Sequence, residues 1–144
     1  MFKRILIATD GSELSQKEAG SGIELAKLSG GEVVALQVVR HAWAGMRASI
    51  SPTEVIRIEK EWADIGQATV GKLKAQAEAQ GVQATGITTH SEMIAEAIIA
   101  AAKKHNCDLI VMASHGRRGL SRMLPGSETT HVLTHSDIPV MVLR

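Results

Sequence analysis

The stretch from Ile110 to Ser127 reads IVMASHGRRGLSRMLPGS and joins a strand, a glycine-rich loop and the start of a helix. Its first part belongs to the apolar run Leu109–Ala113, which is short, continuous and aliphatic, as strands buried on both faces are. Its last residues directly precede a helical pattern that extends from about Ser127 to His135. A strand that leads through a loop into a helix is the unit from which parallel α/β sheets are built.

Other segments of the chain repeat this alternation. Helical spacing of apolar residues predicts three more helices, and the longest carries Ile58, Trp62, Ile65, Leu73 and Ala77 on its apolar stripe. The order of strands and helices predicts an open parallel sheet with helices on both faces. The expected strands are Ile5–Ala8, Val33–Val39, a weaker alternating candidate at Val82–Thr88, Leu109–Ala113 and Pro139–Leu143, and the other expected helices are Ser15–Leu28, Glu54–Gln80 and Ser91–His105, with Ser91 as the N-cap. The segment His41–Thr53 is the only long irregular stretch.

Composition excludes several classes of function. A chain of 144 residues predicts one domain spanning residues 1–144. The net charge of +1 gives no reason to expect a nucleic-acid or membrane partner, and Phe2, Trp43 and Trp62 are too few for a base-stacking platform. Cys107 is the single cysteine, and neither a signal-peptide core nor a membrane-length apolar run occurs. We therefore expect a cytoplasmic protein.

The loop after Ala113 has the composition of a phosphate-binding site. Gly116 permits a close approach of backbone to ligand, and Gly126 with Ser127 stands where a helix would offer free N–H groups and the positive end of its dipole. Arg117, Arg118 and Arg122 add positive charge. A glycine and a serine before a helix are more often a plain cap, so this pattern alone leaves both interpretations open.

Four other groups of residues have two interpretations each. Asp10 follows a strand and could bind Mg²⁺ between phosphates or cap the first helix with Ser12. His131 and His135 stand at a spacing that can hold a metal, but no third ligand is evident, which favours surface histidines. Cys107 could be a reactive thiol or a buried structural one, and its place before a buried strand favours the structural thiol. Trp43 lies in the irregular segment and could belong to a functional loop or to a plain connection.

Taken together, the spacing and order of these motifs resemble the universal stress protein family. The family's loop has the pattern G-x2-G-x9-G-[S/T], matched here by Ala113-x2-Gly116-x9-Gly126-Ser127. ILIATDGSELS near the start resembles the family's first strand and acidic turn, and VLTHSDIPVMVLR resembles its last helix and strand. The resemblance covers the whole chain. It implies an adenine nucleotide α-hydrolase-like fold, an open five-stranded parallel sheet with strand order 3-2-1-4-5 and helices on both faces.

The resemblance also implies an ATP site. Ala8 and Thr9 would lie beside the adenine and ribose, Val38 and Val39 would contact the adenine, and Asp10 would lie near the phosphates or their Mg²⁺. The phosphates would be held by Gly116, Gly126 and Ser127. The complete set of candidate nucleotide-binding residues is Ala8, Thr9, Asp10, Val38, Val39, Ala113, Ser114, His115, Gly116, Arg117, Gly126, Ser127 and Glu128, with Asp10 as the candidate metal ligand.

Ala113 departs from the family pattern because it stands where the family has its first glycine. If that position requires a positive φ, alanine costs about 1 kcal/mol or more, whereas in extended geometry its methyl group only narrows the pocket. Pro125 would stiffen the end of the loop. The resemblance predicts a stress-response or signalling homodimer, paired through Pro139–Arg144, that binds ATP with little or no hydrolysis. A slow Mg²⁺-dependent ATPase and a nucleotide-free interaction module with an unidentified protein partner are the alternatives.

Overall fold

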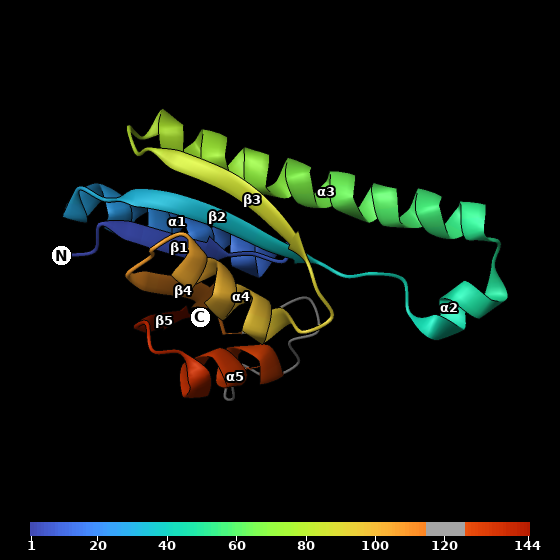
Figure 1. Cartoon of the computed structure of the whole chain (residues 1–144). Helices are drawn as coiled ribbons and strands as arrows, with labels where there is room; N and C mark the ends of the chain where they lie inside the picture. The colour runs from blue at the N-terminus through green and yellow to red at the C-terminus, as the bar shows by residue number, and fades with distance from the viewer. Residues whose placement is uncertain (115–125) are drawn as a thin grey trace.

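The computed structural model describes residues 1–114 and 126–144. These residues form one parallel sheet in the order β3-β2-β1-β4-β5 (Figure 1). In register, Ile5 of β1 pairs with Val33 of β2 on one side and with Leu109 of β4 on the other. The predicted sheet and strand order are therefore confirmed. The strands are β1 Arg4–Ala8, β2 Glu32–Val39, β3 Ala84–His90, β4 Leu109–Ala113 and β5 Val140–Leu143.

Helices cover both faces of the sheet, as the alternation predicts. On one face, α1 (Glu13–Ser29) and α3 (Pro52–Ala79) pack over residues such as Ile7 and Val111. On the other face, α4 (Ile94–Lys104) and α5 (Ser127–His135) pack over residues such as Leu6, Leu36 and Ile110. Consecutive strand residues alternate between these two cores, which explains why the strand sequences are continuously apolar.

Serine caps start the two longest helices. The Ser12 hydroxyl accepts a hydrogen bond from Ser15 N at the start of α1, and the Ser51 hydroxyl accepts one from Glu54 N at the start of α3. The expected cap at Ser91 is wrong. The N-cap of α4 is Met93, and the Ser91 hydroxyl instead accepts from Met93 N at 3.0 Å in a local turn before the helix. Serine favours such turns as well as caps, so its presence did not locate the first helical residue.

Three further expectations are corrected. The segment His41–Thr53 is not wholly irregular, because it contains the short helix α2, Ala44–Ser49. The third strand begins at Ala84 rather than Val82, which is buried just before it. Ile65 does not belong to the buried stripe of α3, since its exposed fraction is 48% and the buried positions are Val55, Gly66, Val70, Leu73 and Ala77. Gly66 lies on Val39 of β2, and a Cβ added there would lie 2.9 Å from Val39 Cγ2.

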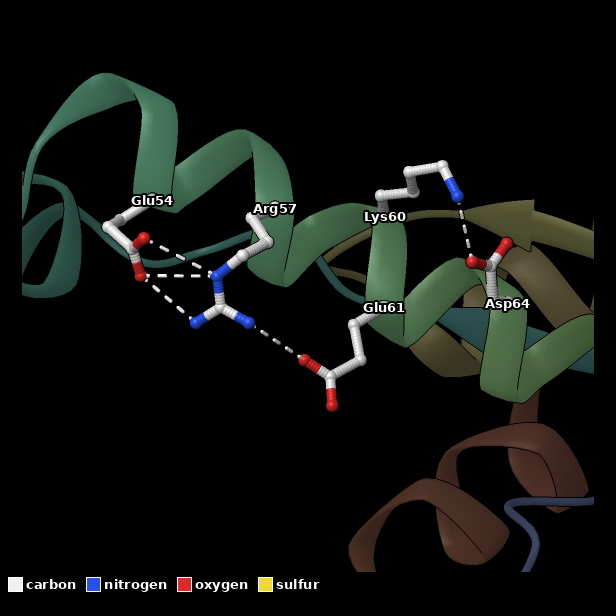
Figure 2. Close-up of polar contacts among 5 residues, drawn as sticks. All are labelled: Glu54, Arg57, Lys60, Glu61 and Asp64. Carbon is white, nitrogen blue, oxygen red and sulfur yellow. Dashed lines mark hydrogen bonds and ion pairs between the residues drawn. The ribbon is translucent and has the colours of Figure 1, made fainter.

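The first half of α3 extends with α2 beyond the carboxyl ends of the strands (Figure 1). Its exposed side carries ion pairs in series (Figure 2): Arg57 Nη2 lies 2.9 Å from Glu54 Oε2, and Lys60 Nζ lies 3.1 Å from Asp64 Oδ2. The hydrogen bond from Arg57 lowers the pKa of Glu54. Fully exposed pairs of this kind contribute little to stability, but their spacing supports the helix where the sheet no longer does.

Cys107 lies inside the α4 and α5 core, just before β4. Burial raises the pKa of its thiol to about 11. The interpretation as a buried structural thiol is therefore confirmed, because at neutral pH the group is neither exposed nor a thiolate. No helix in the two described segments is both long enough and apolar enough to span a lipid bilayer.

Candidate functional site

The strand order places a topological switch point between β1 and β4. From β1 the chain continues to β2 on one side of the sheet, and after β3 it returns to β4 on the other side. Connections therefore diverge at the carboxyl ends of β1 and β4, and ligands of open α/β sheets bind at such a switch point. Thr9 and Asp10 follow the first of these strand ends, and Ser114 follows the second.

The turn after β1 is held by its own hydroxyl and carboxyl groups. Thr9 is buried, its N–H donates to Leu36 O at 2.9 Å, and its hydroxyl accepts from Gly11 N at 3.1 Å. Asp10 Oδ1 accepts from Ser12 N and from the Ser15 hydroxyl, both at 2.9 Å. The N-cap of α1 is Ser12, so Asp10 is not the capping residue; its bonds instead hold Ser12 and Ser15 at the start of the helix. They also fix the carboxyl group close to the carboxyl end of β1.

Two hydrogen bonds fasten the ends of the glycine-rich loop to the end of β4. The N–H of Gly126 donates to Ser114 O at 2.7 Å, and the Thr129 hydroxyl donates to Ala113 O at 3.1 Å. The N–H of Ser114 donates in turn to Leu143 O of β5 at 2.7 Å. The first turn of α5 is thereby placed beside the strand end. The candidates His115, Gly116 and Arg117, together with Arg118, Arg122 and Pro125, lie outside the described residues.

Ala113 occupies ordinary extended geometry as the last residue of β4, paired with Leu143. Among the described non-glycine residues, Asn106 alone has a positive φ. The alanine therefore causes no backbone strain where the family pattern has its first glycine. Its methyl group is buried, so the effect of the departure is confined to the shape of the candidate site.

Gly126 leaves the start of α5 open. Its φ of −63° suits any residue, and among the described residues the nearest atom to a Cβ added to it is Ser114 O at 3.6 Å. No side chain caps this helix within the described chain, unlike α1 and α3. Nothing in residues 1–114 and 126–144 therefore requires glycine at this position. One remaining reason for glycine is that it lets a ligand come close to the backbone N–H groups at the start of α5.

Val38 and Val39 end on opposite faces of the sheet. Val39 is buried beneath Gly66 of α3, whereas Val38 and Ala8 border the α4 and α5 core. Of the two valines, Val38 thus shares a face with α5 and the end of the loop. The alternation of side chains along a strand makes this division unavoidable.

The carboxylate of Glu128 is directed toward α4. Its Oε2 accepts a hydrogen bond from Ala95 N at 3.1 Å. Ala95 is the second residue of α4, and its N-cap Met93 makes no side-chain capping bond. Glu128 is a candidate nucleotide-binding residue by the family resemblance, and no local pattern in the sequence indicates its contact with Ala95.

The described residues hold no group of three His, Cys, Asp or Glu side chains arranged for a metal ion. His131 Nε2 lies 3.0 Å from Glu96 Oε1, and the His131 and His135 rings stack with centroids 4.2 Å apart. These contacts agree with the prediction that the two histidines are surface groups rather than metal ligands, which stays a prediction. Asp10 contributes one carboxylate at the switch point, a donor set that suits Mg²⁺ only when phosphate oxygens complete the shell.

Known proteins resemble this chain along its full length. The model of the universal stress protein family matches residues 1–144. A universal stress protein of Methanocaldococcus jannaschii, MJ0531, is 34% identical and is aligned over 100% of this chain and 83% of its own.

Solved structures share the fold. Hypothetical protein MJ0577 of Methanocaldococcus jannaschii superposes with a TM-score of 0.83 at 26% identity, covering 99% of this chain and 96% of its own. A universal stress protein family protein from Arabidopsis thaliana, solved with AMP bound, gives 0.71 at 16% identity, covering 98% and 90%. A universal stress protein in complex with cAMP gives 0.68 at 17%, covering 99% and 97%.

Proposed function

This chain belongs to the universal stress protein family, and we propose that it binds ATP at the carboxyl ends of β1 and β4. The binding would serve a stress-response or signalling role with little or no hydrolysis. The observation that carries the proposal is the hydrogen bond from Gly126 N to Ser114 O, which holds the uncapped start of α5 at the switch point. The AMP-bound and cAMP-bound structures of the same fold support an adenine nucleotide as the ligand.

The candidate residues take different parts in this site. Ser127 would begin the phosphate-binding turn, whose N–H groups would face the ligand, and Gly126, whose own N–H is bonded to Ser114 O, would leave room for close approach. His115, Gly116 and Arg117 would complete the loop. Ala8 and Val38, on the same face of the sheet, would line the adenine side. Thr9 and Ser114 would shape the site without donating backbone hydrogen bonds to the nucleotide, because their N–H groups are already bonded to Leu36 O and Leu143 O.

Asp10 would hold a Mg²⁺ ion that arrives with the nucleotide. One of its oxygens already accepts two hydrogen bonds from the start of α1, which orients the carboxyl group. Mg²⁺ would neutralise phosphate charge there. Glu128 is bonded to α4, so neither of these two acids is arranged as a base for an attacking water. This arrangement favours binding over turnover.

Mass spectrometry of the supernatant from acid-denatured protein is the direct test. We expect an adenine nucleotide in near-stoichiometric amount, and saturable binding when the stripped protein is titrated with ATP and Mg²⁺. A ligand that binds only the folded state must also raise the melting temperature, by an amount that grows with its concentration. Phosphate release above a metal-only blank would favour the slow ATPase. The absence of both bound and titratable nucleotide would favour the nucleotide-free interaction module.

We also propose that two copies pair through Pro139–Arg144. β5 is an edge of the sheet, and all four of its residues are half-buried. The carbonyls of Pro139 and Leu143 accept bonds from β4, so the N–H of Val142 faces outward, where a second strand could pair.

Val142→Pro removes that outward N–H and is expected to convert a dimer into a monomer in light scattering after gel filtration. Val142→Ala keeps the N–H group and should remain dimeric. A Val142→Pro protein that is folded and still dimeric would place the interface elsewhere.

A further inference from the structure

The N-terminus of α4 contains a buried amide that its own helix cannot satisfy. Ala95 has an exposed fraction of 0% and stands in the first turn, where backbone N–H groups have no intrahelical acceptor. A buried N–H group without an acceptor is strongly unfavourable, so almost all are paired. The side chain of Met93 at the N-cap supplies no acceptor for it. The acceptor is Glu128 Oε2, from a different helix.

Glu128 is also the second residue of α5, next to Ser127 of the proposed phosphate site. Its carboxylate therefore lies near the positive ends of two helix dipoles, those of α4 and α5. A carboxylate beside a phosphate site would repel the ligand if it pointed into that site. The bond to Ala95 holds it against α4 instead and connects the first turn of α5 to that helix.

From this geometry we propose that Glu128 is a positioning residue for the phosphate-binding turn of α5, acting by capping α4 rather than by contacting the nucleotide. The inference rests on the proposed nucleotide function. Among the described residues, three bonds then locate the start of α5: Gly126 N to Ser114 O and Thr129 Oγ1 to Ala113 O fasten it to the end of β4, and Glu128 fastens it to α4. Of these three bonds, only the one to Glu128 joins α5 to the neighbouring helix α4.

Two substitutions of Glu128 separate the effect of its side-chain length from the effect of its charge. Glu128→Gln keeps the length of the side chain and an oxygen that can accept from Ala95 N, but removes the charge. Glu128→Asp keeps the charge but is shorter by one methylene group and loses the contact. We expect Glu128→Gln to bind ATP with Mg²⁺ within about twofold of the wild type, and Glu128→Asp to bind about tenfold more weakly, a difference of about 1.4 kcal/mol.

Adenosine distinguishes positioning from general damage. It lacks phosphates, so its affinity should be equal in the wild type and in both variants. Glu96→Ala is the matched control, because it removes the contact between Glu96 and His131 across the same pair of helices without touching the cap. It should leave the affinity for ATP unchanged.

Hydrogen exchange of the Ala95 amide tests the cap without any nucleotide. The amide should exchange at least about tenfold faster in Glu128→Asp than in the wild type or Glu128→Gln. The Ala97 amide, which bonds to Met93 O at 3.0 Å within α4, serves as the internal reference.

Tighter ATP binding by Glu128→Gln than by the wild type would show that the charge faces the phosphates and would overturn the proposal. Unchanged Ala95 exchange in Glu128→Asp would overturn it as well. If the wild type binds no ATP, the proposed function fails and the positioning role fails with it, whereas the exchange data still decide whether Glu128 caps α4.

Discussion

Gly31→Ala is expected to lower the free energy of unfolding by roughly 3 kcal/mol, a large part of the stability of a domain of this size. A Cβ at this position would lie 2.5 Å from Phe2 O and 3.1 Å from Lys3 O. Both are backbone atoms at the start of β1, so no side-chain rotation can relieve the overlap. The chain there must also let Glu32 N donate to Lys3 O at 2.9 Å, the bond that begins the pairing of β2 with β1.

Gly30→Ala is the matched control for this prediction. Gly30 is the C-cap of α1 with a φ of 68°, and nothing lies within 4 Å of an added Cβ. Its substitution should cost only about 1 kcal/mol, the strain of a left-handed alanine. Urea denaturation of the two variants measures the difference. Equal losses at the two adjacent positions would mean that β1 moves away from Gly31 at little cost, contrary to the packing described here.

Gly126→Asp is expected to weaken ATP binding at least about a hundredfold while leaving the fold as stable or slightly more stable. Gly126 is the N-cap of α5 with φ and ψ of −63° and 161°, the extended geometry that capping residues adopt. Aspartate is a favoured N-cap, and there is space for its Cβ. Its carboxylate would take the helix N–H groups that the phosphates need and would repel the phosphates.

Gly126→Asn separates these two effects, because asparagine caps a helix as well as aspartate does but carries no charge. We expect it to bind ATP more weakly than the wild type and more tightly than Gly126→Asp. Calorimetric titration with ATP and Mg²⁺ gives the affinities, and thermal unfolding without nucleotide gives the stabilities. Wild-type affinity in Gly126→Asp would remove the start of α5 from the nucleotide site.

Gly30 with Gly31, and Gly126 with Ser127, also show how much a local sequence pattern can predict. Glycines at 30 and 31 after a helical pattern correctly indicate its end, because that signal is local. Which of the two is the more costly to replace depends on the start of β1, far away in the sequence. Likewise, Gly126 and Ser127 before a helical pattern indicate an open helix start, but only the bond to Ser114 brings that start to the switch point.

Sequence alone determined the alternation of strands and helices, the family, and the identity of both ends of the loop, because these depend on short patterns of polarity and glycine. Tertiary structure alone decided which residues of a pattern face which neighbour. It left Ile65 of α3 exposed and buried Gly66 beside it, divided Val38 from Val39 between two faces, and bonded Glu128 to Ala95 of α4. In each case the deciding contact joins residues distant in the chain, and a local pattern contains no information about such a partner.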